Sequence, residues 1–241
     1  EPLQKVAETS MTGKGAELNK ELLAQLIVDA VQQVTVEADD GSHIVDLENI
    51  NIETQTGRSA GESELLVGAV VDKDPVQEDM PTEFDDANVL LLNEAIEVEE
   101  ADVDTQVSID SPDQLQQFLD QEEQQLKDKV DRIVESGADV VFCQKGIDDL
   151  AQHYLAKEGI LAVRRVKKAD VRFLREILGA NIVSDLDDFG TEDLGFGNVE
   201  RDDEDELFYV KGAENAHGVT LLLRGSTDHV VDELERGVSD A

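Results

Sequence analysis

The sequence predicts an α/β protein built around a layered sheet. Two observations support this fold class. The first part of the chain combines an amphipathic helix with short alternating strands, and from about Asp79 buried apolar strands alternate with helices. Such alternation is typical of α/β layers. With 40% hydrophobic residues, the 241-residue chain is long enough for one large domain or two ordinary ones, each with its own core.

The first predicted helix covers residues 16–34, where apolar residues recur at the spacing of one helix face. These residues are Leu23, Leu26, Ile27, Ala30, Val31 and Val34. The stretch that follows, IVDLENINIETQTG, alternates apolar and polar residues and ends at Gly57. It predicts short strands.

Five apolar stretches farther along predict buried strands. They are ANVLLLNEAIEV, ADVVFCQKG, GILAVRRV, ANIVSDL and ELFYVKGA. Helices are expected between them at Ile147–Lys157 and Ala169–Leu178. The last segment, residues 218–241, predicts a strand, a turn and a helix.

Asp240 falls in the final turn of that last helix, where a carboxylate opposes the helix dipole. Neither a glycine nor a basic residue caps the end. We therefore expect the helix to continue in a longer parent chain and the sequence to be a fragment.

A long helix is predicted after SIDSPDQ. Ser111 can cap it, Pro112 suits its first position, and Gln114 can close a capping box. Its middle, DQEEQQ, is polar for nearly two turns, so this part does not lie on a core. The spacing alone leaves two arrangements open, a helix whose first half projects into solvent and a loosely packed surface helix. The apolar residues form two patches, Leu115, Phe118 and Leu119, and then Leu126, Val130, Ile133 and Val134.

Acidic residues dominate the composition, with 57 Asp and Glu against 20 Lys and Arg and a net charge of −37. Such a surface repels phosphate backbones, so we expect no nucleic-acid partner. Self-repulsion should destabilise the folded state in dilute salt, whereas at 1 M salt the screening length falls to roughly 3 Å. The charge favours adaptation to a salt-rich cytoplasm over an ordinary acidic protein.

The chain contains neither a long apolar run nor a basic segment followed by an apolar one, which argues against a membrane partner and a signal peptide. Its single cysteine cannot form an internal disulfide. These features predict a cytoplasmic location.

The chain's only cysteine, Cys143, lies near Asp148, Asp149 and His153, which is raw material for an active site. Cys143 ends an apolar strand, where a cysteine is usually buried, whereas a nucleophile must be exposed. Asp149 and His153 stand four residues apart, but two ligands are too few for a metal, so no metal site is predicted. We interpret the exposed face of Ile147–Lys157 as a contact ridge.

The segment TGKG, at Thr12–Gly15, could bring backbone amides and an ammonium group towards a phosphate. It lacks the full P-loop pattern, and no clear strand precedes it. Taken alone, it is better interpreted as a flexible turn.

Three stretches, in this order, carry a close resemblance to a known family. TSMTGKGAE, VVFCQKGIDDLAQHYLAKEGILAVRRVKKAD and LLRGSTDHVVDELERGVSDA resemble the archaeal group II chaperonins, the thermosome subunits. The resemblance extends over essentially the whole chain. It implies an apical domain at 73–217, with a helical protrusion near 108–135, inserted into an intermediate domain formed by 1–72 and 218–241. The equatorial ATP-binding domain is then absent.

The resemblance also implies residue roles. Asp240 matches the aspartate that orients the attacking water in ATP hydrolysis. Lys14, beside Gly13, matches a lysine on a loop that senses the terminal phosphate. The helix after Ser111 matches the built-in lid, which favours the projecting arrangement. Client contacts would then come from Leu115, Phe118 and Leu119 on the lid and from Asp149, Gln152 and His153 on the ridge.

These roles predict part of an ATP-driven folding chamber. ATP and Mg²⁺ would bind mostly through the absent domain, and none is expected on this fragment. The expected partners are non-native client proteins and other chaperonin subunits in a double ring. Hinges would lie near Gly68–Asp79 and Ala213–Gly218. Two alternatives remain, an ATP-independent holdase and, more weakly, a small hydrolase that uses Cys143 and His153.

Overall fold

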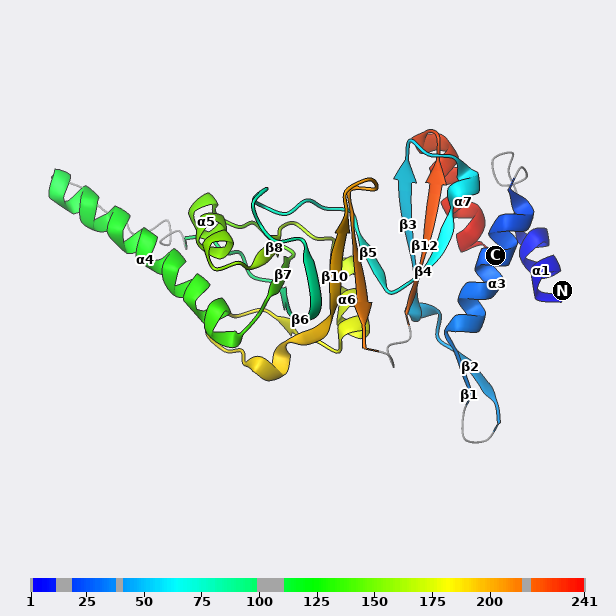
Figure 1. The fold of residues 1–241 in the computed structure, drawn as a ribbon, viewed down its shortest axis with the longest axis horizontal. Helices are drawn as coiled ribbons and strands as arrows, with labels where there is room; N and C mark the ends of the chain where they lie inside the picture. The colour runs from blue at the N-terminus through cyan, green and yellow to red at the C-terminus, as the bar shows by residue number, and fades with distance from the viewer. Residues whose placement is uncertain (1, 12–18, 38–40, 99–110, 214–217, 241) are drawn as a thin grey trace, which may run out of the picture. The chain divides into compact units, whose positions relative to one another are not determined.

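The computed structural model describes residues 2–11, 19–37, 41–98, 111–213 and 218–240 (Figure 1). Contacts divide the chain into two compact units. The first comprises Glu1–Val70 and Ala213–Ala241, and the second comprises Val71–Gly212. Both units mix helices and strands, so the α/β fold class is confirmed.

The first unit is held together by a three-stranded sheet in the order β3–β12–β4. The central strand β12 (Val219–Gly225) comes from the second chain segment. It pairs in parallel with β3 (Ile50–Thr56) and antiparallel with β4 (Glu64–Val67), both from the first segment. All residues of β12 are buried. Main-chain hydrogen bonds therefore join two segments that are far apart in sequence.

Helices cover this sheet with apolar side chains. α3 (Lys20–Gln33) and α7 (Asp228–Ser239) pack on the strands, and α1 (Pro2–Ser10) packs on α3. Leu23 and Ala30 of α3, Leu221 of β12 and Leu234 of α7 share one buried cluster. The helix α3 lies within the predicted range. A separate hairpin pairs β1 (Thr35–Glu37) with β2 (His43–Val45), and its side chains are mostly exposed.

In the second unit the sheet is ordered β11–β10–β6–β7–β8, and β9 also pairs with β6. The strands are β6 (Glu83–Leu92), β7 (Val140–Cys143), β8 (Leu161–Val163), β9 (Ile182–Val183), β10 (Gly195–Asp202) and β11 (Leu207–Gly212). β5 (Ala69–Val71) lies where the two units meet in sequence. β7 and β9 run parallel to β6, and β8 runs parallel to β7, whereas β10 is antiparallel to both β6 and β11.

Three helices belong to this unit: α4 (Pro112–Ser136), α5 (Asp149–Lys157) and α6 (Lys168–Leu178). The predicted start of α4 is correct, because the Ser111 hydroxyl accepts a hydrogen bond from the Gln114 amide and Pro112 opens the helix. Glycine ends α4 and α6 in the left-handed region, with φ of 80° at Gly137 and 64° at Gly179. The apolar faces of β6 and β7 form the core.

The predicted strands exist, but the sequence interpretation missed α1 and four strands, which are β1, β4, β5 and β10. The stretch GFGNVERD of β10 contains two glycines and ends in charges, which hides its strand pattern. Gly197 is required there because a Cβ atom would overlap the Lys211 carbonyl oxygen and lie 2.7 Å from Leu178 Cδ2. Close backbone approach, which a propensity scale does not record, explains this strand's composition.

We expect Gly197→Ala to lower the free energy of unfolding by about 1–3 kcal/mol, the usual cost of overpacking. The backbone of β11 and the end of α6 cannot both move away from the added methyl group. Denaturant titration followed by circular dichroism in molar KCl measures the effect. Gly61→Ala is the matched control, because its Cβ would lie 3.7 Å from the nearest heavy atom. Equal stability of the two variants would contradict this explanation.

Candidate functional site

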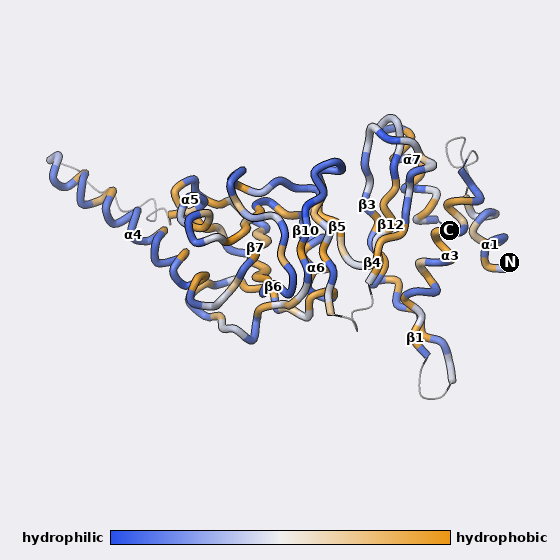
Figure 2. The backbone as a smooth tube through the Cα atoms, in the orientation of Figure 1, coloured by the Kyte–Doolittle hydropathy of each residue, from blue (hydrophilic) through white to orange (hydrophobic). Residues whose placement is uncertain are grey.

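No residue in the first half of α4 is buried against a hydrophobic core. The buried residues of this helix are Leu126, Val130 and Ile133, all in its second half. Leu115 and Leu119 are 45% and 47% exposed, and Phe118 is half-buried. Figure 1 shows α4 leaving the sheet of its unit, and Figure 2 shows its outer half as mostly hydrophilic with interspersed apolar residues. The projecting arrangement is therefore the one that the chain adopts.

The three outer apolar residues share one helix face. Leu115, Phe118 and Leu119 are spaced by three and four positions, so their side chains lie side by side. A face of this kind, surrounded by polar residues and held away from the core, offers apolar surface to another polypeptide. Whether clients bind there stays a prediction.

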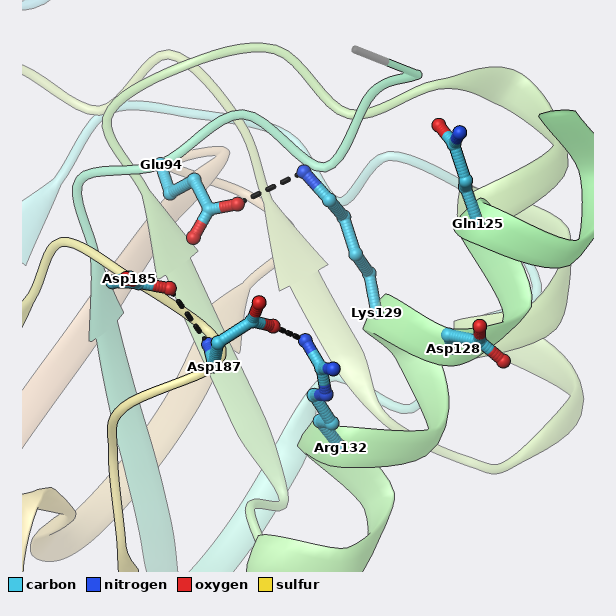
Figure 3. Close-up of a pocket in the computed structure, with 7 residues that line it drawn as sticks. All are labelled: Glu94, Gln125, Asp128, Lys129, Arg132, Asp185 and Asp187. Carbon is cyan, nitrogen blue, oxygen red and sulfur yellow. Dashed lines mark hydrogen bonds and ion pairs between the residues drawn. The ribbon is translucent and has the colours of Figure 1, made fainter.

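Ion pairs fix the second half of α4 to its unit (Figure 3). Lys129 Nζ lies 2.9 Å from Glu94 Oε1, just beyond the end of β6. The other oxygen, Glu94 Oε2, accepts a hydrogen bond of 2.7 Å from the Leu186 amide. One turn farther along, Arg132 pairs with Asp187, whose amide donates to Asp185 Oδ1 at 2.8 Å.

These groups border a polar cavity of about 260 Å³ between α4 and the loop after β9. Its lining residues are Glu94, Gln125, Asp128, Lys129, Arg132, Asp185 and Asp187. The lining contains no serine, cysteine or histidine. Among the described residues no three His, Cys, Asp or Glu side chains are grouped to hold a metal ion. The cavity therefore lies beside the two ion pairs that anchor α4.

A second contact joins α4 to α5. The Tyr154 hydroxyl donates to Glu123 Oε1 at 2.8 Å, and Lys127 Nζ lies 3.1 Å from the same oxygen. The hydrogen bond from Tyr154, and then Lys127, lowers the pKa of Glu123. Burial, and then the hydrogen bond to Glu123, raises the pKa of Tyr154. The carboxylate is thus stabilised in its charged form between two helices.

The contact ridge on α5 is only partly as predicted. Asp149 and His153 are exposed, but Gln152 is 3% exposed, so its predicted place on the open face is wrong. Its amide nitrogen donates to the Ile147 carbonyl at 2.8 Å, and its oxygen accepts from Gln77 at 3.2 Å. Both ends of the amide are satisfied, so burial costs little. Periodicity cannot reveal such a partner.

Cys143 is fully buried at the end of β7, and its thiol donates to the Glu94 carbonyl at 3.2 Å. Burial raises its pKa to about 11. At neutral pH the thiol is therefore protonated and inaccessible, which removes the nucleophile that a hydrolase would need.

The nucleotide-related residues are only partly described. Asp240 is exposed at the C-cap of α7, and its amide donates to the carbonyls of Arg236 and Val238 in the final turn, as predicted. Gly13 and Lys14 lie outside the described residues. Sequence reasoning also missed Glu94 and Lys129, although a charged residue directly after a buried strand requires a partner.

None of the described helices is long and apolar enough to cross a membrane. The sequence profile of the TCP-1/cpn60 chaperonin family matches residues 1–241. A thermosome subunit 2 from Haloferax volcanii is 75% identical over 242 residues, which is 100% of this chain and 43% of that protein. A thermosome subunit beta from Halobacterium salinarum is 68% identical, over 99% of this chain and 43% of that protein.

A solved structure is also similar. It is the open-state monomer of a group II chaperonin from Methanococcoides burtonii, at 40% identity and a TM-score of 0.81, covering 99% of this chain and 54% of that one. The chain therefore spans about half the length of the relatives that it matches, or less. Two of these relatives come from haloarchaea, in agreement with the salt adaptation that the charge predicts. The family profile matches residues 1–241, and a thermosome subunit is 75% identical over the whole chain. The chain therefore belongs to the TCP-1/cpn60 chaperonin family.

Proposed function

We propose that this chain is the client-capturing and lid-bearing portion of an ATP-driven group II chaperonin. Membership of the chaperonin family supports a role in protein folding. The observation that carries the finer proposal is the unsupported outer half of α4, which holds Leu115, Phe118 and Leu119 away from any core. Non-native proteins expose apolar surface that this face can cover.

The energy of capture would come from apolar burial. Each Å² of apolar surface removed from water contributes roughly 25 cal/mol. Covering the open parts of three side chains on several neighbouring subunits would add these small terms into useful affinity. Weak individual contacts also permit release, which a folding chamber needs.

ATP and Mg²⁺ would bind mainly outside this chain, through the equatorial part of the subunit. Within the chain, the exposed carboxylate of Asp240 is free to orient a water molecule towards a terminal phosphate. We infer that Lys14, with Gly13, senses that phosphate. Rotation of the two units near Gly68–Asp79 and Ala213–Gly218 would then carry the lid. Other subunits, in a double ring, would complete the enclosure.

No observation favours the holdase that acts without ATP. The hydrolase loses its nucleophile because Cys143 is buried and protonated. The exposed pair Asp149 and His153 remains available for polar contacts with clients at the α5 ridge.

Replacing the lid residues tests the capture face. The variant carries Leu115→Ser, Phe118→Ser and Leu119→Ser in the complete subunit. It should weaken the free energy of client binding by on the order of 3 kcal/mol per subunit, the transfer free energy of the exposed apolar surface. The measurement is suppression of aggregation of a denatured client by light scattering. Gln117→Ser with Gln121→Ser, two exposed positions on the same helix, is the control. Undiminished suppression by the triple variant would exclude this face.

Removing the carboxylate after α7 tests the nucleotide proposal. Asp240→Ala in the complete subunit should abolish ATP turnover, because no group then orients the water, and should leave ring assembly intact. Phosphate release measures the turnover, and electron microscopy in molar salt measures assembly. Asp232→Ala, an exposed carboxylate on the same helix, should retain activity. Normal turnover by Asp240→Ala would refute the assigned role.

Alkylation tests the burial of Cys143. Under native conditions at pH 7 an alkylating reagent should leave the thiol unmodified for hours, because the pKa is about 11 and the sulfur is buried. In denaturant the same thiol should react fully, as mass spectrometry would record. Rapid native modification would reopen the hydrolase interpretation.

A further inference from the structure

We propose that Glu94 is a positioning residue that sets the direction in which α4 leaves its unit. The inference deepens the proposed lid function and rests on it for its biological consequence. The contacts of Glu94 and Lys129 at the base of α4 do not depend on that proposed function.

The outer half of α4 behaves as a lever. Phe118 lies eleven residues from Lys129, which is about 16 Å along a helix. No residue of the helix before Leu126 is buried, although Glu123 accepts a hydrogen bond from Tyr154 of α5. A tilt of about 20° at the root therefore displaces Phe118 by about 5 Å. In the proposed lid, Phe118 and its neighbours contact the corresponding residues of other subunits. A displacement of about 5 Å would break those contacts.

Glu94 is itself held rigidly. The preceding Asn93 amide donates to the Val183 carbonyl at 2.7 Å, and the Glu94 carbonyl accepts from the Cys143 thiol at 3.2 Å. The residue is thus fixed by β7 and by β9 together. Its two carboxylate oxygens then reach outward, one to Lys129 on α4 and one to the Leu186 amide in the loop after β9. Glu94 therefore links α4 to the end of β6 and to the loop after β9, in addition to the Arg132–Asp187 pair and the Tyr154–Glu123 hydrogen bond.

Charge supplies the direction that apolar contact lacks. Leu126, Val130 and Ile133 bury apolar surface, but hydrophobic contact is non-directional and specifies the orientation of a helix less sharply than a hydrogen-bonded charge. An ammonium group held 2.9 Å from one oxygen, and 3.4 Å from the Ala95 carbonyl, fixes a single rotation and height of the helix. Buried ion pairs often add little stability, yet they can select one arrangement among several.

The pair is also sheltered from salt. The side chains of Lys129 and Glu94 are 13% and 22% exposed, whereas those of Lys127 and Glu123 in the contact with α5 are each 45% exposed. At 1 M salt the screening length is roughly 3 Å, which weakens open pairs first. Salt therefore weakens the exposed Lys127–Glu123 pair, which lies within α4, more than the Glu94–Lys129 pair, which joins α4 to the end of β6.

A spin-label distance measurement tests this joint without nucleotide or client. Labels are attached in the 241-residue chain at Gln117→Cys on α4 and Lys168→Cys on α6, two exposed positions. The buried Cys143 stays unlabelled. The parent should give one narrow distance distribution in 3 M KCl. With Glu94→Leu and Lys129→Met added, the distribution should shift or broaden by about 5 Å, the arc that a root tilt of about 20° allows.

Thermal unfolding of the same samples separates positioning from stability. The apolar pair should keep the unfolding midpoint of the parent while the distance distribution changes. Arg175→Met, which breaks an exposed pair on α6, is the control and should change neither quantity. If the double variant does not fold, Lys129→Met alone should broaden the distribution. An unshifted, narrow distribution in the folded variant would overturn the proposal, whatever the chaperonin's activity.

Discussion

The structure depends on the pairing of β12 between β3 and β4. This strand arrives from the second chain segment after the whole of Val71–Gly212, and its backbone hydrogen bonds close the first unit around that insertion. Without them, the segments on either side of the second unit would have no common sheet. Because the closure is made by main-chain groups at full burial, it is insensitive to the acidic surface chemistry of the chain.

The acidic surface imposes a second constraint. With a net charge of −37, the acidic side chains repel one another. Ion pairs that hold helices and strands in place are therefore most effective where burial shields them from salt and from other carboxylates. Arg224 in the first unit meets this constraint on one side only, because its own side chain is 5% exposed whereas that of its partner Glu64 is 46% exposed. It is buried in β12, lies 2.6 Å from Glu64 Oε1, and donates to the Glu62 carbonyl and to Gln55. Lys129 performs the equivalent task at the root of α4.

Much of the fold could be predicted from the sequence. The start of α4, with Ser111 as its cap and Pro112 in its first turn, follows from local hydrogen-bond chemistry. Apolar runs revealed β6 and β7 because both are buried. β10 was missed because its Gly197 is required by the close approach of the Lys211 carbonyl, which is on another strand. Gln152 was misplaced for the same reason, since its burial depends on Gln77. Local patterns record the period of an element and not its tertiary partners.

The hairpin of β1 and β2 is the least buried pair of strands in the first unit. Two strands alone, with Val36, Ile44 and Val45 turned to water, bury too little to be stable independently. Their opening costs far less than separation of β3 from β12. Thermal opening of the pair β1–β2 can therefore occur while the sheet that joins the two segments stays intact.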